Sequence, residues 1–382
     1  MKSLTLKTLM AAALLLSLVS CAREPVLYLH RDCLIDLNLK VTGADIRTLW
    51  NYEPGYDFER EWVYGWDAED ERIFGPMGYA EMNEFQLRRY YLGHQAGARH
   101  TEVRKDYIEG PSFQGSFSFG YYDLLSWNEI RTVGYGQSIR LKESLDSVVA
   151  YTGETRVSVP EYPGTKATKA FNQPESLFSG YMESLAVTDN PNDYSWNEEK
   201  MCFEKIISLE LQPVTYIYLV QFVLHNNEDR ITMIQGDSNL SAMSSGVCLN
   251  SCVTLDEAVT VNYYTRFKKG VKIAQTGETV DVIGGKLTTF GMCGMNPTKV
   301  STKAELPDEF NRHFLDVNVT FLNGLDSTMV FDVTDKVKER FRGGVITIDL
   351  DVNDIKIPVR PGGSGFDAVV KDPMKEQYEI II

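Results

Sequence analysis

The second half of the chain alternates short apolar stretches with turn residues, and this pattern constrains the fold more than any other feature. In residues 314–322, apolar side chains occupy every second position, so the stretch has one apolar face. Asn323-Gly324 then marks a tight turn before the next stretch. Alternating strands and helices would need helical stretches of about 10 to 15 residues, which the pattern lacks. It therefore predicts an all-β fold of packed sheets. The predicted strands lie at residues 203–211, 215–224, 231–234, 259–266, 279–283, 286–290, 314–322, 328–333 and 345–352.

Signals in the first half are sparser. Residues 33–41 alternate as a half-buried strand does, and residues 116–128 predict two strands with a turn at Gly120. Residues 50–66 predict a loop-rich strand region, and residues 81–92 fit a short amphipathic helix. Residues 159–175 are interrupted by prolines and predict a linker. The turn signals of the second half include Gly284-Gly285, which would separate two strands.

The N-terminus has the three parts of an export signal. Lys2 and Lys7 precede an apolar stretch at residues 9–19, which is too short to span a bilayer as a helix. The stretch ends in Ser20-Cys21, and this resembles the lipobox of bacterial lipoproteins, in which the cysteine is acylated after cleavage. The alternative is an ordinary signal peptide followed by a chance cysteine. We expect a signal peptide at residues 1–20 and lipidation at Cys21.

Charge and cysteine content exclude several classes of protein. The 38 Lys and Arg stand against 53 Asp and Glu, and a net charge of −15 argues against nucleic acid and anionic lipid as partners. Cys248 and Cys252 lie four residues apart, without the second pair that a zinc site needs. Buried thiols and one local disulfide both remain open. The cysteines after Cys21 are Cys33, Cys202, Cys248, Cys252 and Cys293.

No motif for catalysis, a metal or a cofactor is found in the sequence. Ser244-Ser245-Gly246 lacks the upstream glycine of a nucleophile elbow. The five histidines include no pair at the spacing of a helical zinc site. We therefore predict no catalytic residue, no metal ligand and no cofactor, and expect that the protein is not an enzyme.

One aromatic cluster suggests a ligand. Trp50, Trp62 and Trp66 lie among acidic side chains, and such rings can stack on sugars while carboxylates bind the hydroxyl groups. The alternative is that these rings belong to the core of a β domain. Both interpretations remain open at this point.

The order of strand and turn motifs resembles a known family, the lipoprotein anchor and accessory subunits of the type V fimbriae of Bacteroidales. The matching residues are 211–226, 231–236, 241–246, 288–291, 331–335 and a glycine-rich tail at 362–366, with Gly120-Tyr121-Tyr122-Asp123-Leu124 and the lipobox in the first half. Residues 50–100 match no pattern of the family.

The resemblance implies two tandem transthyretin-like β-sandwiches, which we place at residues 21–165 and 166–382. It implies a lipid-anchored protein of the cell outer membrane, exposed at the surface, that pairs strand edges with fimbrial shaft or accessory subunits. The apolar terminal strand with Tyr378, Ile380 and Ile382 is the expected pairing element. The alternative function is glycan binding at the outer membrane through the aromatic cluster.

Overall fold

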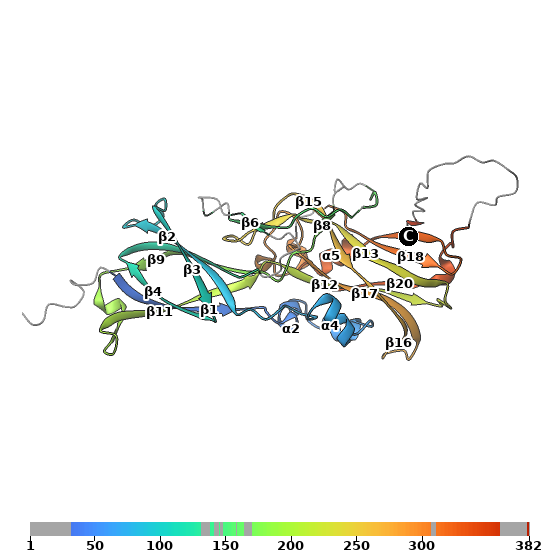
Figure 1. Ribbon diagram of the computed structural model, residues 1–382, viewed down its shortest axis with the longest axis horizontal. Helices are drawn as coiled ribbons and strands as arrows, with labels where there is room; N and C mark the ends of the chain where they lie inside the picture. Colours follow the sequence, from blue (N-terminus) through green and yellow to red (C-terminus); the bar gives the residue numbers. More distant parts are fainter. Residues whose placement is uncertain are drawn as a thin grey trace, which may run out of the picture. The chain divides into compact units, whose positions relative to one another are not determined.

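The structure is a computed structural model in which two compact units form, each from separated segments of the chain (Figure 1). Unit 1 contains residues up to Lys40, Glu84–Ser126 and Met182–Leu209, and unit 2 contains Val41–Asn83, Trp127–Tyr181 and Glu210 onward. The described residues are 32–130, 138–140, 145, 148–157, 159–163, 170–306, 311–359 and 380–381. Cys21, Tyr378 and Ile382 lie outside these residues.

Most of unit 1 belongs to an eight-stranded sheet with the order β3-β2-β5-β9-β11-β1-β4, and β10 pairs with β11 beside this path. Its inward side chains include Leu37, Leu87, Phe117 and Leu124, all fully buried. The strands are β1 (Asp32–Val41), β2 (Glu84–Gly93), β3 (Glu102–Glu109), β4 (Ser112–Ser118), β5 (Gly120–Asn128), β9 (Phe178–Val187), β10 (Ser195–Asn197) and β11 (Cys202–Pro213).

Arg89 contacts both ends of this strand order. β3 and β4 stand at opposite ends, although only Gly110 and Pro111 separate them in sequence. The buried guanidinium of Arg89, on β2, forms an ion pair with Asp106 of β3 at 2.7 Å. It also donates a hydrogen bond to the carbonyl oxygen of Ser116 on β4 at 2.9 Å. One side chain therefore links the two ends of the sheet.

Unit 2 contains three further sheets. Their orders are β16-β17-β12-β20, β21-β19-β18-β13-β15-β8 and β14-β7-β6. The strands are β6 (Ser138–Arg140), β7 (Val149–Tyr151), β8 (Ala170–Asn172), β12 (Tyr216–His225), β13 (Ile231–Ser244), β14 (Gly246–Cys248), β15 (Ala258–Tyr264), β16 (Arg266–Lys272), β17 (Thr279–Thr289), β18 (Phe314–Phe321), β19 (Asp326–Asp332), β20 (Gly344–Asp351) and β21 (Ile380–Ile381). The helices are α2 (Ile46–Trp50), α3 (Phe58–Glu61), α4 (Ala68–Phe74) and α5 (Thr334–Glu339).

The main core of unit 2 lies between the four-stranded and the six-stranded sheet. Phe222 and Ile346 of the first sheet share one buried cluster with Leu240, Leu315 and Phe331 of the second. Alternation places these side chains on the facing sides of the two sheets. The chain is therefore all-β with packed sheets, as the sequence predicts.

The four-stranded sheet is covered on both faces. Ile217, Leu219 and Val223 of β12 point away from the main core into a second cluster, which contains Trp50 of α2 and Phe58 of α3. A strand that is buried on both faces has a continuous apolar run instead of an alternating one. This explains why nearly every residue of β12 is apolar and buried.

Three predictions about helices, strands and turns are wrong. Residues 81–92 contain no helix, and most of them belong to strand β2, because Phe85 and Leu87 alternate into the core while the buried Arg89 interrupts the apolar pattern. Residues 50–66 form loops and the helix α3, so the expected strand there is absent. Gly284 and Gly285 lie inside the continuous strand β17.

The glycine pair in β17 allows close packing and makes no turn. A Cβ atom at Gly284 would lie 2.4 Å from the ring of Tyr64, and one at Gly285 would lie 2.4 Å from the carbonyl oxygen of Tyr264. Both contacts are too short for a real Cβ atom. Glycine in a strand interior often marks such an approach. In contrast, the predicted hairpin at Asn323-Gly324 is confirmed as the β18–β19 turn.

The predicted linker at residues 159–175 is wrong for its described part. Tyr162 is buried, and β8 pairs in parallel with β15. The division into domains at residues 21–165 and 166–382 stays a prediction. It divides the chain once, whereas both compact units combine separated segments.

Candidate functional site

The three tryptophans of the predicted ligand site lie over the outer face of the four-stranded sheet. Trp50 and Trp62 are 1% and 8% exposed, and Trp66 is half-buried. The Trp50 ring meets Phe58 edge to face at 5.1 Å, and its indole N–H donates to the carbonyl oxygen of Arg342. The Trp62 indole donates to Gly65 at 2.8 Å. Trp50 and Trp62 are therefore buried against the protein.

Hydrogen bonds hold this aromatic segment, residues 50–66, on the sheet. The fully buried side chain of Gln221 on β12 accepts from the backbone N–H of Tyr64 at 3.0 Å. It donates to the carbonyl oxygen of Glu61 at 2.6 Å. At the outer edge of β20, the hydroxyl of Tyr56 accepts from the backbone N–H of Val345 at 2.7 Å. The segment thus satisfies polar groups of two strands.

A buried carboxylate lies just after the segment, on α4. Asp70 of α4 is fully buried and accepts from the hydroxyl of Tyr64 at 2.7 Å. Arg266 and Lys268 of β16 contact it at 2.7 and 2.5 Å. Burial would raise the pKa of the Asp70 carboxyl, but hydrogen bonds from Lys268, Tyr64 and Arg266 outweigh burial and lower it. The site is a satisfied ion cluster that fastens α4 to the sheet.

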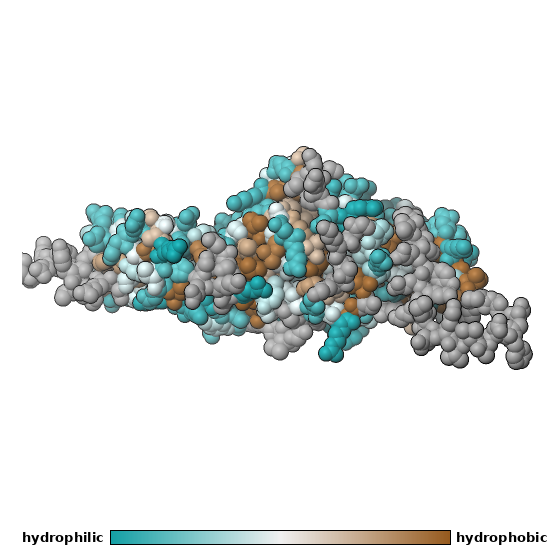
Figure 2. Space-filling view, turned by 90° about the horizontal axis from the view of Figure 1, so that it is seen from above, coloured by the Kyte–Doolittle hydropathy of each residue, from teal (hydrophilic) through white to brown (hydrophobic). Residues whose placement is uncertain are grey.

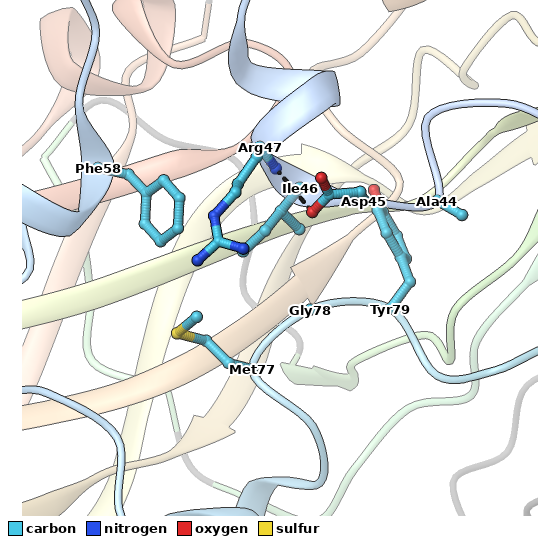
Figure 3. Close-up of a pocket in the computed structure, with 8 residues that line it drawn as sticks. All are labelled: Ala44, Asp45, Ile46, Arg47, Phe58, Met77, Gly78 and Tyr79. Atoms are coloured by element: carbon cyan, nitrogen blue, oxygen red, sulfur yellow. Dashed lines mark hydrogen bonds between the residues drawn. The ribbon is translucent and has the colours of Figure 1, made fainter.

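A pocket of about 450 Å³ opens beside α2 (Figure 3). Figure 3 shows the Arg47 side chain extending between Phe58 and Met77. Lys286 of β17 holds the segment that carries Met77: its ammonium donates to the carbonyl oxygens of Pro76 and Gly78 at 2.6 and 2.7 Å. Burial lowers the pKa of Lys286 to about 8. The pocket is lined by Ala44, Asp45, Ile46, Arg47, Phe58, Met77, Gly78 and Tyr79, and the predicted tryptophans are absent from this set.

The C-terminal strand lies at an edge of the six-stranded sheet. β21 pairs in parallel with β19, with Ile380 opposite Met329 and Ile381 opposite Val330. Of the expected pairing residues, Ile380 is therefore placed in a ladder of its own chain. Among the described residues, this short strand is what pairs with the outer edge of β19.

The outer face of the same sheet carries a polar ladder, formed by Tyr162, Asp316, Asn239 and Asn262. The hydroxyl of Tyr162 and the amide of Asn239 donate to the carboxylate of Asp316. Asn262 donates to the side-chain oxygen of Asn239 at 3.0 Å. Burial raises the pKa of Asp316 to about 6, although these hydrogen bonds oppose the rise. Sequence analysis missed this ladder because its members come from four separated segments.

Cys252 is a free thiol, so the local disulfide between Cys248 and Cys252 is absent from this structure. Within the described ranges, His, Cys, Asp and Glu side chains form no group of three or more that could hold a metal ion. In that same part of the chain, no helix is long and apolar enough to cross a bilayer.

Figure 2 shows hydrophilic residues over much of one face, with hydrophobic residues in scattered spots. Exposed large apolar side chains are Tyr107, Trp196, Met201, Ile206, Met233, Val253, Tyr264, Leu322 and Val359. Three of them, Trp196, Met201 and Ile206, come from one hairpin, β10–β11, which sequence analysis did not single out. A single tryptophan in a polar stretch gives no periodic signal.

Comparisons with known proteins give matches among solved structures alone. No family model and no curated protein matches the chain. The chain is similar to a candidate adhesin from Bacteroides ovatus, with 14% identity, a TM-score of 0.47 and coverage of 89% of this chain and 98% of that one. It is similar to a fimbrial anchor protein from Porphyromonas gingivalis, with 10% identity, a TM-score of 0.39 and coverage of 83% and 90%. It is also similar to a truncated tip fimbrial protein from that organism, with 10% identity, a TM-score of 0.31 and coverage of 78% and 81%. At these values the likenesses carry no argument about function.

Proposed function

We propose that this chain is a non-enzymatic, lipid-anchored subunit of a fimbrial or adhesive assembly at the outer membrane, and that it binds its neighbour by strand pairing. Two sequence features support the proposal: the lipobox at Cys21 and the ordered strand motifs shared with fimbrial anchor and accessory subunits. An extended segment that joins an open sheet edge gains main-chain hydrogen bonds along its length. An all-β protein offers such edges.

The pairing of β21 with β19 is the observation that carries the role of an anchor. Ile380 and Ile381 lie in register with Met329 and Val330 of the same chain. A terminal strand that is used inside its own sheet cannot at the same time complete a neighbouring subunit. The protein then receives a strand and donates none, which suits the base of an assembly.

Edge composition indicates where a strand would be received. β3 at one end of the eight-stranded sheet carries five charged residues, and β16 carries four in another sheet. Charged side chains, lysine especially, protect edges from pairing. β4, at the other end of the eight-stranded sheet, carries none. Its exposed side chains are Ser112, Gln114 and Ser116. We assign β4 as the accepting edge.

Cysteine cross-linking tests the anchor role. Met329→Cys with Ile380→Cys should give a disulfide within one chain, found by peptide mapping after mild oxidation of intact cells. The pair Asn318→Cys with Thr328→Cys, which lies opposite across β18 and β19, is the positive control. A link from position 380 that forms only between two molecules would show that the strand is donated, and the anchor role would have to be given up.

Lysine substitution tests the accepting edge. Ser112→Lys with Ser116→Lys places two charges on β4, and we expect co-purification of fimbrial subunits to fall while the melting temperature stays unchanged. Tyr107→Lys, on the already charged strand β3, is the matched control and should leave co-purification intact. Equal co-purification of both variants would rule out β4.

The alternative function, glycan binding through Trp50, Trp62 and Trp66, stays a prediction. Of the three rings, Trp66 is the most exposed, and its indole N–H has no hydrogen-bond partner among the described residues. Binding to polysaccharide in affinity electrophoresis that falls with Trp66→Ala would favour this alternative.

A further inference from the structure

The β10–β11 hairpin of unit 1 projects beside the main strand path of its sheet and carries an aromatic cluster. Trp196 lies opposite Phe203 in the ladder, and their rings meet edge to face at 5.0 Å. Tyr194 packs on the same phenylalanine, and the ammonium of Lys205 lies 5.8 Å from the tyrosine ring centre. Unlike Trp50 in the aromatic segment of unit 2, Trp196 of this cluster is partly exposed.

The hairpin exposes three large apolar side chains to solvent. Trp196 is 38% exposed, Met201 is 61% exposed and Ile206 is 70% exposed. Met201 also has a φ of +52°, a left-handed conformation that costs free energy for a residue with a side chain. The sequence thus keeps a large apolar side chain at the tip in a strained position.

The hairpin lies at the end of unit 1 where β1 begins. Burial and the nearby Cys33 thiol raise the pKa of the Tyr194 hydroxyl, so the second residue of β1 is adjacent to the hairpin. The hydrogen bond to Glu204 raises the pKa of Lys200 most, burial opposes the rise, and the nearby Asp36 carboxylate adds to it, so Asp36 of β1 also lies near the hairpin. Figure 1 shows the start of β1 and the hairpin at the same end of this unit.

The chain length before β1 limits how far this end can be from a membrane. Cys21 precedes Asp32 by eleven residues. A fully extended chain spans at most about 3.3 to 3.6 Å per residue, which gives roughly 40 Å. If Cys21 is acylated, the hairpin is therefore held within about the thickness of one bilayer from the lipid surface.

We propose that the β10–β11 hairpin is a membrane-contacting element that rests on the phospholipid leaflet holding the acylated Cys21. This rests on the lipid anchoring in the proposed function. Tryptophan and tyrosine favour the headgroup region because they combine an apolar ring with a polar group. An acyl anchor gains from a second membrane contact.

Charge defines the kind of lipid surface. Glu198 and Glu199 are exposed at the tip, while Lys200 pairs with Glu204 at 2.5 Å. An uncompensated acidic tip is repelled by anionic headgroups and stays hydrated, so the contact is shallow. The hairpin therefore fits a zwitterionic leaflet rather than an anionic one.

Fluorescence quenching of the full-length lipidated protein tests the proposal. The protein is reconstituted into phosphatidylcholine and phosphatidylethanolamine vesicles that contain dibrominated phosphatidylcholine. Of the five tryptophans, Trp50, Trp62 and Trp127 are buried, so lipid quenching should come mainly from Trp196. Trp196→Phe keeps a ring against Phe203 and should abolish most of the quenching. Exchanging half of the lipid for phosphatidylglycerol should reduce the quenching of the wild type.

Tyr107→Phe is the matched control. Tyr107 is 49% exposed on β3 and lies near the Gly110 turn that leads into β4. The first residue of β4 pairs with Asn38, so this turn lies at the opposite end of β1 from the hairpin. This variant should be quenched like the wild type.

Vesicle-bound protein without quenching of Trp196 would overturn the membrane contact and leave the anchor intact. Trp196 emission that shifts only on addition of fimbrial subunits or polysaccharide would overturn it in favour of that partner. Protein that neither binds vesicles nor partitions into detergent would instead overturn the acylation of Cys21.

Discussion

The aromatic segment of unit 2 and the β10–β11 hairpin of unit 1 are both rich in aromatic residues, but they differ in what covers them. In the aromatic segment, Trp50 packs against the four-stranded sheet and its indole finds a backbone acceptor. In the hairpin, the ring of Trp196 meets Phe203 edge to face and stays 38% exposed. The denser cluster is thus largely buried, and the sparser one offers surface. Density of aromatic residues in a sequence says little about which rings a ligand can reach.

Replacing Trp50 with alanine tests the buried cluster of the comparison and should have the largest effect on stability. The substitution removes a ring that is 1% exposed and contacts Phe58, so the cavity and the lost burial should cost about 3 to 5 kcal/mol of unfolding free energy. Urea denaturation of both proteins measures the difference. A loss below 1 kcal/mol would mean that the segment is not part of the folded core of unit 2.

The pH dependence of folding stability is a second test of the buried region, since Lys286 holds the loop beside the aromatic segment. Burial lowers its pKa to about 8, from an ordinary value of 10.5. Between these two values the unfolded chain binds more protons than the folded one, so folding stability should rise with pH from about 8 to 10.5. The full rise is up to roughly 3 kcal/mol.

Lys286→Met is the control for that rise, because methionine does not titrate. The difference in unfolding free energy between wild type and variant should change across this pH window and stay constant below it. Parallel curves for the two proteins from pH 7 to 10.5 would show that Lys286 titrates normally in the folded state.

Replacing Trp196 with alanine should have the smallest effect. The side chain is partly exposed and lies on a projecting hairpin, so we expect a change within about 0.5 kcal/mol. Thermal melts beside the Trp50→Ala protein give the direct comparison. A loss as large as that of Trp50→Ala would make the hairpin a structural element and remove the reason to look for a partner there.

The sequence was a good guide where one physical effect dominates and a poor one where two compete. In β18, alternation alone separates Leu315 and Val317 from outward polar residues, and both the strand and its hairpin were predicted correctly. In β2, the buried Arg89 breaks the apolar pattern, and a helix was predicted instead. Arg89 is buried because Asp106 and a strand carbonyl receive its hydrogen bonds, and neither partner is visible locally.

The candidate sites follow the same division. The tryptophans of residues 50–66 were found because they are numerous, but their burial depends on contacts with β12, more than 150 residues away. The pairing of Ile380 with β19 also depends on a distant strand. Trp196 was missed because its exposure depends on how distant parts of the chain pack around it, and no local sequence pattern indicates that.

The polar ladder on the six-stranded sheet has a consequence for how this sheet assembles. Side chains alternate along a strand, so a slip of one residue between β13 and β18 would turn Asp316 toward the apolar core and deprive it of Asn239. An unpaired carboxylate in an apolar core costs several kcal/mol. A misaligned pairing of these two strands is therefore disfavoured by the position of a single carboxylate.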